Sequence, residues 1–300
     1  MDAITLKQAH IGMVGVGLMG HGIASNVQNA GWLLHFLDHP GNQPVEGLVA
    51  QGAKAHPGCK SLAAECEVII LCVTGSPQVE EVLFREDGIL AGIRPGSVVI
   101  DCSTSIPRST VAIAQAVEQA GGYFMDAPMT RTPKEAAEGR LNLIVGGERE
   151  LFEACLPLLQ SYAEHITHAG PVGAGHKMKL LHNFVSLGFS TVLAEVAACA
   201  ERGGIDSEVL VEVLAQGGGK GAILDRLSPY ILSQDTSGFQ FSLANAHKDL
   251  DYYISMATYL GAARQTALSI AGVFEEGIAA RGPQTTVPEL ISILADTRGD

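Results

Sequence analysis

Two side chains suited to proton transfer lie four residues apart in the stretch GHKMKLLHN, residues 175–183. On a helix this spacing places Lys179 and Asn183 on one face, where both can reach a single substrate oxygen, whereas Lys177 has the apolar Leu181 at the same offset. A lysine with an ordinary pKa of about 10.4 is protonated at neutral pH and can donate to an alkoxide. The pair therefore indicates acid–base chemistry at a hydroxyl or carbonyl group; the alternative is a solvated lysine near a helix end.

A glycine-rich turn, GVGLMG at residues 15–20, has the spacing of a dinucleotide-binding loop. It follows an apolar run at 10–15, and a second apolar run ends in Asp38. In such loops the glycines permit a tight turn and close approach of the pyrophosphate to the backbone, while the acid accepts the ribose hydroxyls. Because a carboxylate repels a 2′-phosphate, we expect NAD in preference to NADP, although a protonated His39 would attract that phosphate. The alternative is a glycine-rich turn beside a surface acid.

The arrangement of apolar segments predicts two domains. Short apolar runs alternate with helix-length amphipathic stretches at 10–15, 33–38, 68–73, 97–102, 123–128 and 141–147. This alternation predicts an α/β domain with a mostly parallel sheet over residues 1–170, and polar turns after its strands belong at the ligand-binding edge. Residues 171–300 have no strand pattern and predict an all-helical domain, entered through one long helix that stops at Gly203–Gly204.

Composition excludes several classes of protein. A net charge of −13 over 300 residues argues against a nucleic-acid partner. The six cysteines form no C-x-x-C pair and no secretory leader is recognisable, so we expect a reduced, cytoplasmic protein. The apolar run 184–200 contains Glu195 and is shorter than the ~20 residues that span a bilayer, which predicts a buried helix and no membrane association. His165 and His168 lack neighbouring ligands at metal spacing, and no metal site is expected.

Five segments together resemble the β-hydroxyacid dehydrogenase family, which includes 3-hydroxyisobutyrate dehydrogenase and tartronate semialdehyde reductase. They are GVGLMG (15–20), DCSTSIP (101–107), DAPMTRTPKEAAEGRLNLIVGG (126–147), GPVGAGHKMKLLHN (170–183) and AHKDL (246–250). The resemblance covers almost the whole chain and implies a Rossmann-like domain joined by a long helix to an all-α domain. It also implies hydride transfer between NAD and a small anionic hydroxyacid or aldehyde, in a homodimer or homotetramer.

The resemblance also assigns roles to individual residues. It implies that Lys179 is the catalytic acid/base, with Asn183 as its partner, and that Ser103 binds the substrate's anion. The residues that it places at the cofactor are Gly15, Val16, Gly17, Leu18, Met19, Gly20, Asp38, Val73, Thr74, Thr104 and Lys248. Val73-Thr74-Gly75 departs from the family's usual Leu-Pro-Asn. The alternatives are helix capping by Ser103 or Ser105 and an exposed Lys248 paired with Asp251 or a glutamate.

The turn after DAP departs from the family pattern. Most relatives continue with Ser-Gly-Gly, but this chain has Met129, Thr130, Arg131 and Thr132, so that a guanidinium replaces a glycine. Because a guanidinium suits oxyanions and is costly to bury unpaired, we expect Arg131 and the backbone at Thr130 to bind a substrate anion. The alternative is that Arg131 points outward to Glu135 or Glu138.

Three features of this chain resemble the family's sulfolactaldehyde reductases. These are the Arg-Thr pair at 131–132, Ser186 beyond the catalytic lysine, and GGGKGA at 217–222. His182 stands where those enzymes have Asn, a replacement that can shift selectivity to another acid, so Ser186 and His182 are both expected at the substrate. An imine reductase shares this architecture, but such relatives generally lack the lysine kept at 179. A non-catalytic dinucleotide sensor is a further alternative, and the intact pair Lys179 and Asn183 argues against it.

Overall fold

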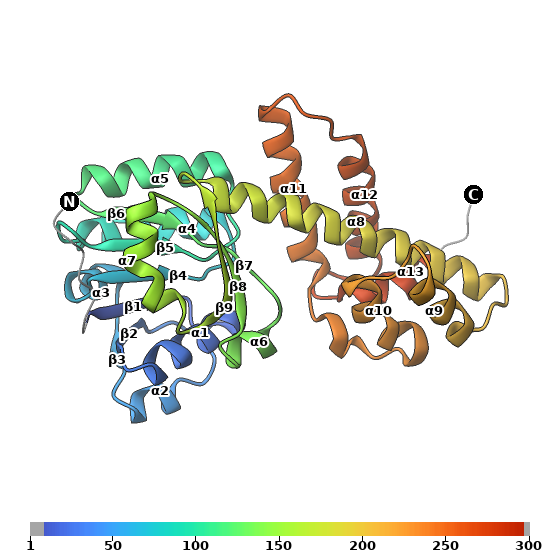
Figure 1. Cartoon of the computed structure of the whole chain (residues 1–300), viewed down its shortest axis with the longest axis horizontal. Helices are drawn as coiled ribbons and strands as arrows, with labels where there is room; N and C mark the ends of the chain where they lie inside the picture. The colour runs from blue at the N-terminus through green and yellow to red at the C-terminus, as the bar shows by residue number, and fades with distance from the viewer. Residues whose placement is uncertain (1–8, 297–300) are drawn as a thin grey trace. The chain divides into compact units, whose positions relative to one another are not determined.

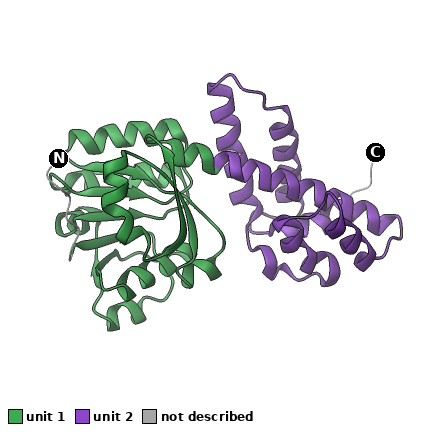
Figure 2. Ribbon diagram, in the orientation of Figure 1, with its two compact units in different colours: residues 1–179 green, residues 180–300 purple. Residues whose placement is uncertain are grey.

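The computed structural model describes residues 9–296, which divide into two compact units (Figure 2). We call residues up to Lys179 the sheet unit and residues from Leu180 onward the helical unit. Helix α8 (Ala174–Arg202) passes through this division. The predicted domain boundary, at 170/171, falls at the end of strand β9.

The sheet unit is built on a mostly parallel sheet of nine strands within the described residues (Figure 1). Their order is β3-β2-β1-β4-β5-β6-β8-β7, with β9 pairing with β8. Only β8 pairs antiparallel, with β6 and β7. The strands are β1 (His10–Val14), β2 (Leu33–Leu37), β3 (Lys54–His56), β4 (Val68–Leu71), β5 (Val98–Asp101), β6 (Tyr123–Asp126), β7 (Met129–Thr130), β8 (Leu141–Gly146) and β9 (Ala163–Gly170). The predicted fold class is confirmed.

Alternating side chains along the strands enter two hydrophobic clusters. Met13 of β1 packs in a cluster with residues of α1 and α7, whereas Val14 packs in a second cluster with residues of α3, α4 and α5. This period of two is the usual consequence of the strand pleat. The helices of this unit are α1 (Leu18–Asn29), α2 (Glu46–Ala50), α3 (Cys59–Glu65), α4 (Ser76–Phe84), α5 (Pro107–Gln119), α6 (Pro133–Ala137) and α7 (Arg149–Leu159).

The helical unit packs the remaining helices around its own core. They are α9 (Ser207–Gln216), α10 (Ala222–Ser233), α11 (Leu243–Tyr259), α12 (Gln265–Arg281) and α13 (Leu290–Asp296), together with the rest of α8. Leu187, Leu227 and Phe274 are fully buried in this core. As predicted, α8 ends just before Gly203–Gly204, where Gly204 adopts φ 71° and breaks the helix.

Helix α8 is longer than the apolar run that marks it in the sequence. By length and composition alone it is long and apolar enough to cross a membrane. Half of its most apolar window is buried inside the protein, however, and the core helix of a soluble protein can be as long and as apolar. The helix therefore gives only weak evidence for a membrane.

Candidate active site

The glycine turn has the shape that a pyrophosphate requires. Gly15 follows β1 with φ 94°, and a Cβ there would lie 2.3 Å from the Cys72 carbonyl oxygen. A Cβ on Gly20 would lie 1.9 Å from the Gly15 carbonyl oxygen, so that helix and turn can pack only through glycine. Gly17, the N-cap of α1, has no atom within 4 Å of such a Cβ. The turn thus leaves open space before the free amides of a 12-residue helix, and these residues fit a dinucleotide.

The acid of the predicted ribose site lies exposed just after β2, as Asp38. The following loop folds back onto the glycine turn, because the Gln43 amide donates to the Val16 carbonyl at 2.8 Å. Within this loop the Gly41 amide donates to His39 Nδ1 at 3.0 Å.

Two turns at the neighbouring strand ends are tied together. The Val73 amide donates to Ser103 Oγ at 3.0 Å, and the Ser103 amide donates to Asp101 Oδ1 at 2.9 Å. Ser103 is buried and Thr104 half-buried, whereas Thr74 is exposed. The capping alternative for Ser103 and Ser105 is wrong, since α5 starts after Ile106 without a side-chain cap and Ser105 donates to Asp101 instead. The Ser103 oxygen thus already accepts one bond, while its hydroxyl hydrogen remains available to a ligand.

A buried network at the start of α8 was missed by the sequence analysis. Asp126, which ends β6, accepts hydrogen bonds from the Gly173 amide at 2.6 Å and the His176 amide at 2.7 Å. The His176 ring is fully buried, with Nε2 3.1 Å from the Ser103 carbonyl oxygen and Nδ1 2.8 Å from Thr110 Oγ1. The start of the helix that carries Lys179 is thereby fixed to the turn that carries Ser103.

The electrostatics of this network depend on burial. Burial raises the pKa of Asp126, while the nearby His176 and the two backbone amides act in the opposite direction. His176 Nδ1 lies 3.8 Å from Asp126 Oδ2, and its Nε2 lies 3.8 Å from Asp101 Oδ2. The sequence does hold a sign of this network, because two of the predicted strands end in an aspartate, Asp101 and Asp126. In the structure these two residues are direct partners in adjacent strands.

Arg131 has a partner that the sequence did not indicate. Its guanidinium pairs with Glu164 of β9 and donates to the Arg140 carbonyl. The two acids of the alternative have other partners: Glu135 accepts from the amide and hydroxyl of Thr132, which begins α6 in a capping box, and Glu138 pairs with Arg140. The charge of Arg131 is thus neutralised within the sheet unit. Its backbone, at φ 83°, lies in the left-handed region that favours glycine.

The helical unit holds Asn183 in a polar cluster. Asn183 is 7% exposed, donates from Nδ2 to Asp249 Oδ2 at 2.6 Å, and has Oδ1 3.0 Å from His182 Nδ1. Lys248 Nζ lies 3.0 Å from Asp249 Oδ1 and 5.1 Å from the ring centroid of Tyr252. Sequence analysis missed Asp249, although it is part of the AHKDL segment that signalled Lys248. An oriented Asn183 amide keeps one N–H for a further oxygen.

The remaining predicted site residues lie on α8, α11 and β7. Lys179, on α8 one turn before Asn183, is half-buried, as is Ser186 two turns beyond Lys179. In place of the alternative pairing of Lys248 with Asp251 or a glutamate, Lys248 forms an ion pair with Asp249, and Asp251 lies 3.3 Å from His247. Thr130 ends β7 and is half-buried.

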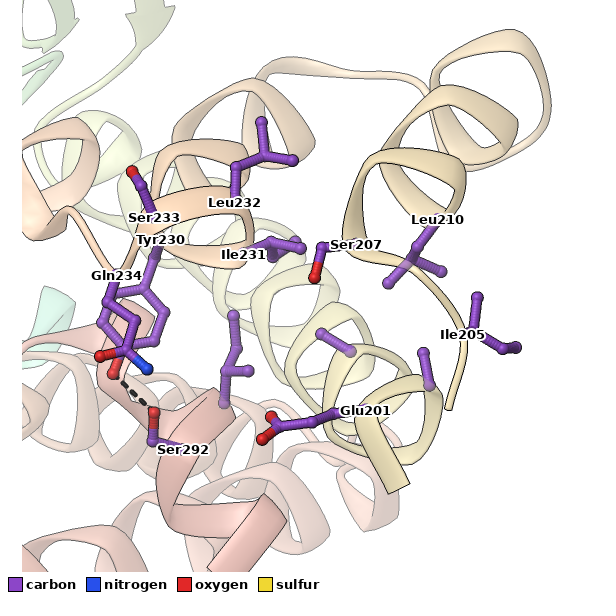
Figure 3. A pocket seen from close by; sticks show the side chains of 13 residues that line it. Glu201, Ile205, Ser207, Leu210, Tyr230, Ile231, Leu232, Ser233, Gln234 and Ser292 are labelled. Carbon is purple, nitrogen blue, oxygen red and sulfur yellow. Dashed lines mark hydrogen bonds between the residues drawn. The ribbon is translucent and has the colours of Figure 1, made fainter. Parts of the chain in front are cut away.

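A separate hollow of about 290 Å³ lies within the helical unit (Figure 3). Its lining includes Glu201 and apolar residues such as Ile205 and Leu210, and the Tyr230 and Ser292 hydroxyls bond across it at 2.7 Å. None of its 13 lining residues is a candidate site residue from the sequence. A lone carboxylate with hydroxyls gives no acid–base pair, so we assign the chemistry elsewhere.

Family models match both halves of the chain. Residues 10–170 match the NAD binding domain of 6-phosphogluconate dehydrogenase. Residues 173–294 match a domain described as NAD-binding of NADP-dependent 3-hydroxyisobutyrate dehydrogenase. The two matches together include the glycine turn, the network at the start of α8 and the Asn183 cluster.

Curated relatives and solved structures agree with the family models. The chain is 34% identical over 220 residues to NAD-dependent L-serine dehydrogenase of Pseudomonas aeruginosa, covering 73% of this chain and 74% of that one. It is 31% identical to 3-sulfolactaldehyde reductase of Escherichia coli, covering 92% and 93%. A structure of Mycobacterium tuberculosis 3-hydroxyisobutyrate dehydrogenase with L-serine has a TM-score of 0.84 at 25% identity, covering 96% of this chain and 99% of that one.

Proposed function

Because the chain belongs to the β-hydroxyacid dehydrogenase family, we propose that it interconverts a short hydroxyacid bearing a primary alcohol with its semialdehyde, using Lys179 as general acid/base. Like its relatives, the chain is an NAD(P)-dependent oxidoreductase of small hydroxyacids or their aldehydes. The role of Lys179 is supported by its pairing with Asn183, one helical turn further along α8, where Asn183 is held by Asp249.

NAD is the cofactor that these residues fit. When bound, its nicotinamide accepts a hydride from the alcohol or donates one to the aldehyde. The turn at 15–20 would hold the pyrophosphate and Asp38 the ribose, and the carboxylate of Asp38 supports NAD over NADP because it repels a 2′-phosphate. Val73, Thr74 and Thr104, at the ends of neighbouring strands, would line the nicotinamide end. We keep Lys248, by the family resemblance alone, as a further cofactor-binding residue.

The chain's own residues would handle the proton. In the oxidation, Lys179 Nζ takes the hydroxyl proton as the carbinol hydrogen leaves as hydride; in the reduction it returns a proton to the oxygen. Asn183 would donate its remaining N–H to the same oxygen and so orient it. For the oxidation direction Lys179 must first give up its own proton.

Three residues are placed to bind the substrate's anion. Ser103 offers its hydroxyl hydrogen, and we keep Arg131 and the Thr130 backbone as anion-binding groups. The pairing of Arg131 with Glu164 means that its charge no longer requires a substrate anion. His182 and Ser186, on α8 beside Asn183, would set selectivity among acids.

A more specific candidate function is sulfolactaldehyde reduction. The 31% identity to 3-sulfolactaldehyde reductase over 92% of the chain favours it, and the relation to L-serine dehydrogenase favours a hydroxyacid without a sulfonate. An NADH-oxidation screen over aldehyde acids with and without a sulfonate, and an NAD-reduction screen over serine, glycerate, threonate and 3-hydroxyisobutyrate, separates the two.

The proposed function is tested by replacing the acid/base. We expect Lys179→Ala to lower kcat by about 10²–10⁴-fold, the usual contribution of a positioned acid or base, while the Kd for NADH measured by fluorescence stays unchanged. Lys177→Ala, an exposed lysine on the same helix, is the matched control and should keep full turnover. Full turnover in Lys179→Ala would remove this lysine from the mechanism, and NADH binding without turnover of any acid by the wild type would favour a dinucleotide sensor.

We further propose a cytoplasmic homo-oligomer, a homodimer or homotetramer. An apolar stripe on α8, formed by Leu181, Val185, Val192 and Val196, is exposed at 37–70% per residue. The steps of four, seven and four residues keep these side chains on one face of the helix. A second copy of the chain would cover this stripe.

A further inference from the structure

Three histidines from neighbouring strands line up on one face of the sheet. His10, His35 and His56 come from β1, β2 and β3, three strands that are neighbours in the sheet. His10 Nδ1 lies 2.8 Å from His35 Nε2, and His35 Nδ1 lies 2.8 Å from His56 Nε2. His35 is 5% exposed and His56 2%, so two of the three rings are withdrawn from water.

A carboxylate completes this cluster from outside. Glu65, the last residue of α3, has Oε2 3.9 Å from His35 Nδ1, and its side chain is 46% exposed. The ligand atoms of His35, His56 and Glu65 all lie within 4.8 Å of one another. Lys54 of β3 also pairs with Glu65. Two imidazole nitrogens and a carboxylate oxygen thus converge beside solvent.

We propose that His35 Nδ1, His56 Nε2 and Glu65 Oε2 bind one divalent transition-metal ion, for which Zn²⁺ is the best fit, with His10 orienting His35. A tetrahedral ion with bonds of about 2.0–2.2 Å separates its ligand atoms by roughly 3.3–3.6 Å. The present separations of 2.8 Å and 3.9 Å lie on either side of this value, and the third pair of ligand atoms lies within 4.8 Å, so side-chain adjustments, mainly of the half-exposed Glu65, form the site. Water takes the fourth position from the exposed side of Glu65.

The two imidazole rings are placed to offer lone pairs to a cation. His35 and His56 are buried, and His35 Nδ1 and His56 Nε2 face each other at 2.8 Å beside Glu65. Burial also lowers the pKa of both rings. The hydrogen bond from Lys54 lowers the pKa of Glu65, which keeps the carboxylate ionised. The ion displaces Lys54 from Glu65 Oε2 or shares the carboxylate with it.

His10 would orient His35 without binding the metal ion itself. With His35 bound through Nδ1, the only proton on that ring sits on Nε2 and points at His10 Nδ1. Such an acceptor fixes the tautomer and the ring orientation of a metal-bound histidine. Ligands of this type, two imidazoles and a carboxylate, suit Zn²⁺, Co²⁺, Ni²⁺ and Cu²⁺ better than Mg²⁺ or Ca²⁺.

The test measures metal binding directly and does not depend on turnover. The full chain without a histidine tag, carrying Cys199→Ser to remove an exposed thiol, is treated with chelator and titrated with Zn²⁺ by calorimetry. Co²⁺ is then titrated and followed by visible absorption, which is strong for tetrahedral cobalt. We expect one Zn²⁺ per chain and a tetrahedral cobalt spectrum that Zn²⁺ abolishes.

Variants assign the site to these residues. Glu65→Gln and His56→Gln each remove a ligand, and each should weaken Zn²⁺ binding by at least about 100-fold. This is more than the loss expected when only a hydrogen-bond partner of a ligand is removed. Glu65 is half-exposed, so its replacement should be tolerated by the fold. His10→Leu should weaken Zn²⁺ binding by about 10–100-fold. His165→Gln replaces an exposed histidine outside the cluster and is the matched control. No stoichiometric Zn²⁺ binding by the parent chain, or unchanged binding in Glu65→Gln, would overturn the proposal and leave a hydrogen-bonded histidine ladder.

Discussion

Arg131 occupies a backbone position made for glycine. Its φ of 83° is one of two positive values at non-glycine residues among those described. Holding a residue with a Cβ in this region costs about 1–2 kcal/mol. The ion pair with Glu164 and the bond to the Arg140 carbonyl offset part of that cost. The chain therefore retains Arg131 at some expense, which makes the residue a candidate for function.

The balance at Arg131 can be measured. We expect Arg131→Gly to change the free energy of unfolding by less than about 1 kcal/mol, because relief of backbone strain offsets the loss of a partly exposed ion pair. Glu164→Ala loses the same ion pair without relieving the strain and should be the more destabilising change in urea denaturation. If the two variants are equally destabilised, the backbone at 131 is not strained.

The same variant addresses substrate binding. If Arg131 holds the substrate's anion, Arg131→Gly raises KM for the anionic substrate far more than Glu164→Ala does, since only the former removes the guanidinium. An equal effect of both variants on every substrate would give Arg131 a structural role alone.

Residues that act locally were predictable from the sequence, and residues that act through distant partners were not. The glycine turn and the Lys179–Asn183 spacing are visible because each is contained in one turn of chain. Asp126 and His176 are 50 residues apart, and Asn183 and Asp249 are 66 residues apart. Such pairs depend on tertiary contacts that no local pattern records.

At the scale of single elements, burial decided which strands were predictable. The six predicted runs became buried strands, whereas β3 and β7 have only three and two residues. Strand β9, AEHITHAG, is mostly exposed or half-buried along one edge of the sheet, so it lacks the continuous apolar run expected of a central strand. The prediction therefore captured the core of the sheet and missed its edges.

The start of α8 depends on one buried carboxylate. Asp126→Ala leaves the Gly173 and His176 amides buried without an acceptor, and we expect it to lower the free energy of unfolding by about 2–4 kcal/mol. Asp38→Ala, an exposed acid at the end of another strand, should change it by less than about 0.5 kcal/mol without cofactor. Urea denaturation measures both, and matched values would mean that Asp126 does not anchor the helix.

The cluster of His10, His35 and His56 predicts that stability depends on pH. His35 has its pKa lowered from 6.5 to about 4, and it faces His10, His56, Glu65 and Lys54. Between those pH values the unfolded chain binds more protons than the native one, so stability is full above pH 6.5 and falls as the pH drops toward 4. The shift corresponds to about 3 kcal/mol.

The pH dependence is measured in the presence of a chelator, by urea denaturation between pH 4 and 7. His35→Gln should show a shallower loss of stability with falling pH than the wild type, because it removes the titrating ring. His165→Gln, which removes an exposed ring, should keep the wild-type slope. A slope that is the same in all three proteins would place the pH dependence elsewhere.

At the scale of the whole molecule, each unit has its own buried core. The clusters around β1 and the sheet belong to the sheet unit, and the cluster around Phe274 belongs to the helical unit. Fold class and the all-helical second half followed from the change in hydrophobic period near residue 170, which is a property of the whole sequence. The hydrophobic period does not tell how many copies of the chain assemble.

The apolar stripe on α8 makes assembly testable. Val185 is 70% exposed and lies within the stripe, so Val185→Asp would place a charge in the proposed interface between copies. We expect it to weaken association by at least about 2 kcal/mol, roughly 30-fold in Kd, and to lower the mass measured by light scattering at micromolar concentration. Val49→Asp makes the same change at a 49% exposed valine on α2 and should leave the mass unchanged. If Val185→Asp keeps the wild-type mass, or if the wild type is a monomer, the stripe is not the surface through which copies associate.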